Sequence, residues 1–116
     1  LLPTGKLLSL KNDAYHFSPP KKINQIELDT PFVLNHTSKL GQRAASVYSE
    51  KSKLRMDVYT DQDILVCFTP QEFTGICFET QGYPDAPSHE NFKTIVIDKD
   101  RPYQQETRYK FEKTAE

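Results

Sequence analysis

The sequence predicts an all-β sandwich. Short runs with apolar or alternating character recur along the 116 residues, and turn-forming residues separate them about every 8–12 positions. No window shows the 3.6-residue period of an amphipathic helix. About eight short strands are therefore expected. The length fits a single unit that spans residues 1–116.

The first third of the chain is expected to hold two strands. Lys6–Leu10 is apolar enough for a short strand, and turn residues follow it. Two adjacent prolines exclude a helix over Tyr15–Lys22, because proline lacks an amide hydrogen and fixes φ, so this segment is expected to be extended. Pro31–Asn35 is a brief apolar strand, and the acidic residue Asp29 precedes it.

The middle of the chain predicts a β-hairpin followed by a buried strand. Ala44–Ser49 and Lys53–Thr60 alternate between apolar and polar residues, with a polar turn between them. In the second of these strands, Leu54, Met56 and Val58 share one face, and Arg55, Asp57 and Tyr59 share the other. Ile64–Thr69 is a continuous apolar run, which predicts a strand covered on both faces.

Gly75–Gln81 has the composition of a strand whose end carries polar side chains. Ile76, Phe78 and Thr80 fall on alternate positions, so Cys77, Glu79 and Gln81 occupy the opposite face. Gly82 and Pro84 then end the strand. A carboxylate and an amide two residues apart on one face of a strand end could be held rigidly and still be reached by a ligand.

The C-terminal third is expected to contain one loop and two strands. Tyr83–Asn91 contains two prolines and several polar residues, which predicts a loop. This loop is long and polar enough to have a functional role. Thr94–Ile97 is predicted to be a second buried strand, and a turn follows it. Gln105–Phe111 alternates between aromatic and charged residues and forms the last predicted strand.

Composition narrows the class of partner. The formal net charge is -1, from 15 basic and 16 acidic residues, and this balance argues against a nucleic-acid-binding surface. The sequence contains no run of about 18 apolar residues, so no membrane span is predicted. The first residues include neither an initiator Met nor a signal pattern, so we interpret the chain as cut from a longer protein. The chain has two cysteines, Cys67 and Cys77, which could form a disulfide. Because two cysteines make a poor disulfide framework, we expect reduced thiols in a cytoplasmic protein.

A set of residues in the C-terminal half of the chain carries a resemblance to a known family: Glu79-Thr80-Gln81, Pro84-Asp85-Ala86, Phe92, Tyr103, Thr107, Tyr109 and Phe111. With these residues the chain resembles the C-terminal portion of the aldose 1-epimerase (galactose mutarotase) family, and the similarity extends from Leu2 to Phe111. The resemblance implies part of a galactose mutarotase-like antiparallel β-sandwich, or supersandwich.

The resemblance also implies an activity and residue roles. The family interconverts the α and β anomers of a free aldohexose and needs no metal or organic cofactor. Glu79 corresponds to the family's catalytic base, and we expect the fold to bury it partly so that it is a stronger base. Asp29 corresponds to a sugar-binding Asp, and a carboxylate suits this role because it accepts charge-assisted bonds from hydroxyl groups. Gln81, beside Glu79, is a further candidate for substrate binding.

Two departures from the family pattern affect these expectations. The family's general acid is a His in a Tyr-Phe-Asn-Leu motif, and neither His16, His36 nor His89 lies in such a motif. The acid is therefore expected from a missing N-terminal portion, and this chain alone is expected to be inactive. In addition, Val66 and Phe68 stand where many mutarotases place a Gln and a Tyr, so a preference for galactose is not implied.

Other functions remain open from the sequence. A non-catalytic carbohydrate-binding β-sandwich module could use Asp29 and Glu79 only to bind hydroxyl groups. A glycosidase would need these two carboxylates roughly 5–10 Å apart across a glycosidic bond. The expected partners are a free aldose and the missing N-terminal portion of the same protein. A second copy of the chain is a further possible partner, because half of a sandwich exposes apolar faces.

Overall fold

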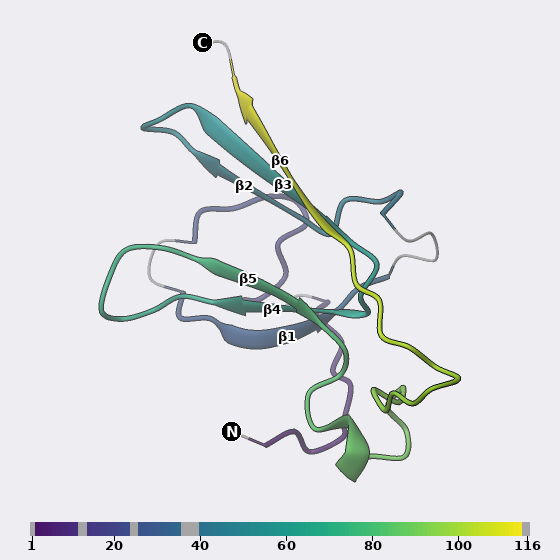
Figure 1. Ribbon diagram of the computed structural model, residues 1–116. Coiled ribbons are helices and arrows are strands. Elements are labelled where there is room, and N and C mark those ends of the chain that lie inside the picture. The colour runs from purple at the N-terminus through teal and green to yellow at the C-terminus, as the bar shows by residue number, and fades with distance from the viewer. Residues whose placement is uncertain (1, 12–13, 24–25, 36–39, 115–116) are drawn as a thin grey trace.

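The computed structural model describes residues 2–11, 14–23, 26–35 and 40–114, and it contains two antiparallel sheets of three strands each (Figure 1). One sheet has the strand order β1-β4-β5, and the other has the order β2-β3-β6. The predicted all-β class is confirmed. The elements are β1 (Asp29–Val33), β2 (Ala45–Ser49), β3 (Leu54–Thr60), β4 (Ile64–Phe68), β5 (Cys77–Gln81), a turn of 3-10 helix η1 (Ala86–Ser88), and β6 (Thr107–Lys113).

The predicted hairpin is present as β2 and β3, and β6 extends it into a sheet. Ala45 pairs with Val58 and Ser49 with Leu54, while β6 pairs with β3 along its whole length. Directly paired residues share a face, so the predicted alternation of β3 is confirmed. Val58, fully buried, lies on the inner face. The outer face of β3 carries Arg55, Asp57 and Tyr59.

The other sheet is built around β4, which pairs with β1 on one side and β5 on the other. The continuous apolar run of β4 predicts burial on both faces, and Ile64, Leu65 and Cys67 are all buried. This prediction is confirmed. β4 therefore holds the strands that carry Asp29 and Glu79, one on each side of it.

The core of this sheet is formed on its inner face, toward β2. Leu28, Leu65 and Cys67 are its buried centre. Around them pack partly buried residues from the N-terminal segment and from β1, β2 and β5: Phe17, Ile26, Phe32, Leu34, Ala44, Ala45, Ile76 and Phe78. Phe78 lies on this face, as the alternation of β5 predicts, and so Glu79 is directed to the opposite, outer face.

Two predicted strands are absent. Lys6–Leu10 has no regular structure, and Leu8 is 82% exposed. Thr94–Ile97 is also irregular and its three apolar side chains are exposed, so the prediction of a buried strand there was wrong. An apolar run predicts burial only when another layer of the fold covers it, and no described element covers this one. The described residues form six strands instead of about eight.

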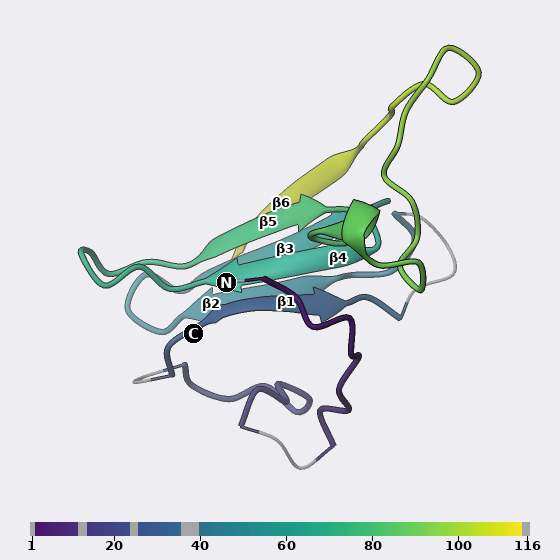
Figure 2. The same ribbon diagram turned by 90° about the horizontal axis from the view of Figure 1, so that it is seen from below.

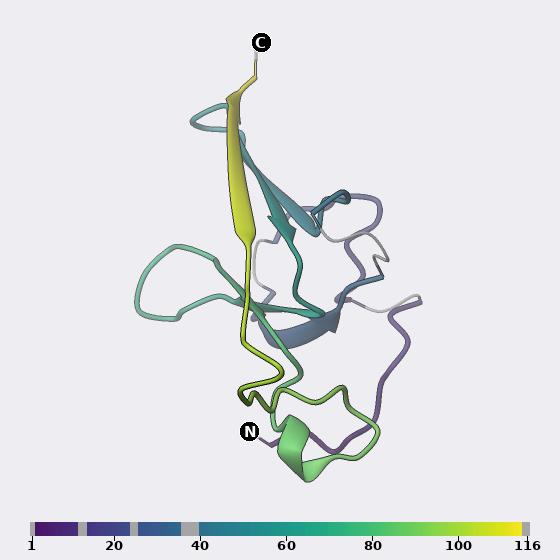
Figure 3. The same ribbon diagram turned by 45° about the vertical axis from the view of Figure 1, so that its right-hand side comes forward.

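Two long segments lie outside the sheets. Figure 2 shows the described parts of the segment before β1 following an irregular path, as the prolines predict for Tyr15–Lys22. The segment between β5 and β6 projects beyond the sheets, with η1 near its start. Among the described strands, none lies beside the outer edge of β6 (Figure 3).

The chain is less compact than an isolated domain of its size. Its radius of gyration is 15.6 Å, whereas about 13 Å is typical for this length. Its accessible surface is 9088 Å², compared with about 6,500 Å² for a folded monomer of this mass. Large apolar side chains on the inner face of the β2-β3-β6 sheet are among those exposed, including Leu54, Tyr109 and Phe111. The described residues contain no helix with the length and apolarity needed to cross a membrane.

Candidate functional site

The three predicted site residues lie on one face of the β1-β4-β5 sheet. Asp29 pairs with Phe68, and Glu79 pairs with Val66, two positions away on the same central strand. Gln81 lies two residues beyond Glu79. Since side chains alternate along a strand, Asp29, Glu79 and Gln81 all emerge on the outer face. The structure therefore brings together residues that are 50 positions apart in the sequence.

Asp29 and Glu79 are separated by the width of β4 and by two residue positions along it. β1 and β5 are separated by two strand spacings and the residues are offset by two positions, which gives about 12 Å between the Cα atoms of Asp29 and Glu79. Val66 and Phe68 of β4 lie on the same face between them. A ligand that touches both carboxylates would therefore rest on an apolar surface.

Glu79 is exposed, and Asp29 is also exposed. The partial burial expected for Glu79 is not supplied by the described residues of this chain. Gln81 is half-buried, and its Nε2 donates to the carbonyl oxygen of Gly82 at 3.3 Å. This bond ties the Gln81 side chain to the backbone where the strand ends.

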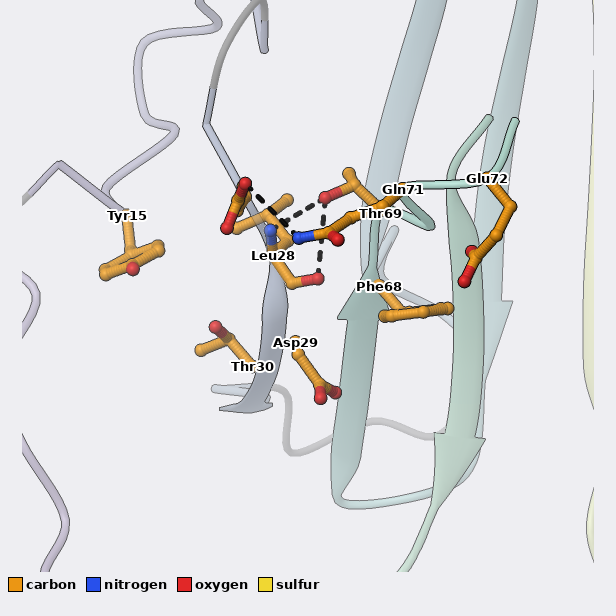
Figure 4. Close-up of a pocket in the computed structure, with 9 residues that line it drawn as sticks. Tyr15, Leu28, Asp29, Thr30, Phe68, Thr69, Gln71 and Glu72 are labelled. Carbon is orange, nitrogen blue, oxygen red and sulfur yellow. Dashed lines mark hydrogen bonds between the residues drawn. The ribbon is translucent and has the colours of Figure 1, made fainter. Parts of the chain in front are cut away.

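A cavity of about 490 Å³ lies at the Asp29 end of the sheet (Figure 4). Its volume is within the range typical of ligand pockets. Asp29 and Phe68 line it from paired positions, and Glu72 lines it from the loop after β4. Glu79 is not among its lining residues. The remaining lining residues are Tyr15, Glu27, Leu28, Thr30, Thr69 and Gln71.

Two hydrogen bonds among the residues that line this cavity join the residue before β1 to the residue after β4. The backbone N–H of Leu28 donates to Thr69 Oγ1 at 2.8 Å, and the backbone N–H of Thr69 donates to the carbonyl oxygen of Leu28 at 2.8 Å. Gln71 Nε2 donates to Glu27 Oε1 at 3.5 Å (Figure 4). No motif in the sequence marks Gln71 and Glu72 as site residues. Gln71 reaches Glu27 because β4 pairs with β1, and this pairing is not visible in the sequence.

The two described histidines, His16 and His89, lie outside the strands. His16 is exposed in the N-terminal segment. His89 lies in the loop after β5, where its Nε2 is 3.2 Å from Asp85 Oδ2 and its ring is 4.9 Å from that of Phe92. His36 lies outside the described residues. These contacts give His89 a local role in holding the loop.

The two cysteines are not bonded to each other. Cys67 pairs with Phe78 and faces the core, whereas Cys77 pairs with Phe68 and lies on the outer face. Burial, together with the negative charge of Glu79, raises the pKa of the Cys67 thiol to about 12. A thiol of this kind is protonated at neutral pH and behaves as a small apolar side chain.

No group of three or more His, Cys, Asp or Glu side chains suited to hold a metal ion occurs in the part of the chain that the structure describes. The polar groups placed on the outer face by β1 and β5 are the carboxylates of Asp29 and Glu79 and the amide of Gln81. Carboxylates serve as proton acceptors and as hydrogen-bond acceptors for sugar hydroxyl groups.

Comparisons with known proteins identify the family to which the chain belongs. A maltose epimerase from Levilactobacillus brevis is 22% identical over 130 residues, which cover 95% of this chain and 38% of that protein. The chain thus spans well under half the length of this relative. No solved structure matches it significantly. A sequence model described as aldose 1-epimerase matches residues 1–110. The chain belongs to the aldose 1-epimerase family.

Proposed function

We propose that the protein carrying this chain is a mutarotase that interconverts the α and β anomers of a free aldose, with Glu79 as the general base. The observation that carries the proposal is that Asp29 and Glu79 flank β4 on one face of the sheet. Membership of the aldose 1-epimerase family supports the reaction class. Asp29 and Gln81 are proposed to bind the sugar.

The proposed reaction needs one base and one acid on opposite sides of the sugar. Glu79 takes the proton of the anomeric hydroxyl group while an acid protonates the ring oxygen, so the bond between C1 and the ring oxygen breaks. The C1–C2 bond rotates, and the ring closes on the other face of the aldehyde. Asp29 accepts hydrogen bonds from sugar hydroxyl groups and holds the rest of the open-chain sugar in place while the C1–C2 bond rotates.

We propose that the acid, a histidine, comes from an N-terminal portion of the protein outside this chain. The chain corresponds to 38% of the maltose epimerase, and among the described residues no hydrogen bond or ion pair joins His16 or His89 to Glu79. The exposed surface exceeds that of a folded monomer by about 2,600 Å², which is the area that a permanent interface buries. Additional polypeptide, or a second copy of the chain, is proposed to cover it.

The proposed substrate is a free reducing sugar held on the apolar strip of Val66 and Phe68. These side chains offer no hydrogen bonds, so selectivity for a galactose hydroxyl group is not expected from β4. The maltose epimerase relative suggests that reducing disaccharides are included. Because Cys67 and Cys77 are both free thiols, we propose a cytoplasmic location.

The test is the Glu79→Gln variant of the complete protein, assayed by polarimetry with freshly dissolved α-glucose, α-galactose and α-maltose. Loss of the base should lower kcat by about 100-fold or more while KM changes little. Glu90→Gln, a matched change of an exposed carboxylate in the loop after β5, should leave both constants unchanged. Wild-type kcat in Glu79→Gln would rule out the proposed base.

A second candidate function is a carbohydrate-binding module without catalysis. It is favoured by the exposure of Glu79 and by the cavity that holds Asp29 but not Glu79. In that case the complete protein would bind sugars measurably by calorimetry but would not speed the approach to anomeric equilibrium. Acceleration that depends on Glu79 decides for the epimerase.

A further inference from the structure

We propose that Thr107 is a positioning residue for Glu79, acting through a hydroxyl chain that fixes the end of β5. This inference rests on the proposed role of Glu79 as the base. Thr107 is the first residue of β6, and it belongs to the other sheet. Figure 1 shows the start of β6 beside the end of β5.

The hydroxyl chain consists of Thr80, Thr107 and Thr60, and it joins the two sheets. Thr80 Oγ1 lies 2.8 Å from Thr107 Oγ1, and Thr107 Oγ1 lies 3.2 Å from Thr60 Oγ1. Thr60 is fully buried and pairs with Thr107 across β3 and β6. Hydrogen bonds shielded from water are the ones that hold a geometry most firmly.

A single direction of hydrogen-bond donation satisfies all three hydroxyl groups of this hydroxyl chain. Gln105 Nε2 donates to Thr80 Oγ1 at 2.7 Å, Thr80 donates to Thr107, and Thr107 donates to Thr60. Thr60 Oγ1 donates to the carbonyl oxygen of Glu106 at 3.4 Å and also accepts the backbone N–H of Gln62 at 3.1 Å. Each hydroxyl group has one hydrogen to give, and each finds an acceptor.

The outer edge of β5 needs such support, because in its sheet β5 pairs with β4 alone. Gln105 Nε2 also donates to the backbone carbonyl oxygen of Thr80 at 2.9 Å. Gln105 therefore holds both the backbone and the side chain of Thr80 from the free side. Tyr103 donates from its hydroxyl group to Gln105 Oε1, which fixes the amide in this orientation.

The link to Glu79 is covalent and short. Thr80 follows Glu79 directly, and its side chain points inward while that of Glu79 points outward. A rotation of the strand about its axis at Thr80 therefore moves the Glu79 carboxylate in the opposite sense, and a sideways shift moves it in the same sense. A general base must be held within about 0.5 Å of its productive position. The hydroxyl chain supplies this restraint from the far side of the sheet.

The test compares Thr107→Val with Thr107→Ser in the complete protein, by polarimetry with α-glucose and α-maltose. Valine keeps the shape of threonine but removes the hydroxyl group, so kcat should fall about tenfold while KM stays within twofold. A misplaced catalytic group costs rate in this way. Serine restores the hydroxyl group and should recover at least half of kcat. Thr74→Val, in an exposed loop, is the matched control and should behave like the wild type.

A second variant keeps the inference testable if Thr107→Val does not fold. Gln105→Ala removes the restraint on Thr80 at an exposed position, and it should also lower kcat without raising KM. A wild-type kcat in folded Thr107→Val or in Gln105→Ala overturns the positioning role. Glu79→Gln separates the two proposals: if it abolishes turnover while these variants keep theirs, only the positioning role fails. If Glu79→Gln keeps full turnover, the proposed function fails first.

Discussion

Asp29 and Glu79 lie on the same face of one sheet, on the strands to either side of β4. Each pairs with a different residue of β4, so their spacing is fixed by two backbone ladders and does not depend on a loop. Asp29 also lines the cavity at the end of the sheet. The two carboxylates thus have different surroundings, which fits one base and one binding group.

Asp29→Asn should weaken sugar binding more than it slows the reaction. The amide keeps the size of the carboxylate but loses the charge-assisted bonds to hydroxyl groups, each of which contributes about 1.5–3 kcal/mol. In the complete protein, KM for α-glucose should rise about tenfold or more, and kcat should change less than threefold. Asp100→Asn, on an exposed turn between β5 and β6, is the control. A lower kcat with unchanged KM would contradict a binding role.

The isolated 116-residue chain should self-associate and bind an apolar fluorescent dye. Tyr109 is 50% exposed and Phe111 is 59% exposed, both on the inner face of the β2-β3-β6 sheet. Apolar patches of this kind are usually covered by a partner surface. Sedimentation at micromolar concentrations should show oligomers, and the double variant Tyr109→Lys, Phe111→Lys should reduce both effects. A monomer that binds no dye would argue against an uncovered face.

The stability of the fold should fall in acid, in part because of Asp57. Asp57 is buried, and a hydrogen bond from Ser46, followed by the charges of Arg55, Arg43 and Lys110, holds its pKa below the usual 3.8, although burial alone acts in the opposite direction. The folded state therefore binds fewer protons than the unfolded state in acid. This contribution is present above about pH 4 and is lost as the pH falls through the lowered pKa.

Asp57→Asn tests this contribution by urea unfolding at pH 7 and pH 3. At pH 7 the free energy of unfolding should fall by about 1–3 kcal/mol, because the variant loses the charge that the Ser46 hydrogen bond and the ion pairs with Arg43 and Arg55 stabilise, while both arginines remain partly exposed to water. The decrease between pH 7 and pH 3 should be smaller than in the wild type. An unchanged pH dependence in the variant would show that other groups dominate.

Thiol labelling should distinguish the two cysteines. Cys67 is buried and its pKa is raised to about 12, so it should resist a maleimide reagent at pH 7.5. Cys77 is only half-buried on the outer face and should react first. Mass spectrometry after a short exposure should locate the label on Cys77, and unfolding in urea should release Cys67. Equal labelling of both residues in the folded chain would contradict the packing of β4.

The predicted elements that were confirmed are those whose pattern reflects their own surroundings. The alternation of Lys53–Thr60 and the apolar run of Ile64–Thr69 predicted β3 and β4 within one residue at each end. The apolar run Thr94–Ile97 has a similar pattern but is exposed. Its apolar pattern predicts that another layer of protein covers it. Which layer does so is not encoded in the segment itself.

The candidate site, too, was predicted from the sequence only in part. Alternation along β5 was enough to place Glu79 and Gln81 together on one face, because the side-chain period of a strand is a local property. That Asp29 shares this face, that Val66 and Phe68 lie between the two carboxylates, and that Thr107 reaches Thr80 from the other sheet were decided by tertiary structure. These contacts join residues 13 or more positions apart, and their register depends on pairing between strands that no local pattern encodes.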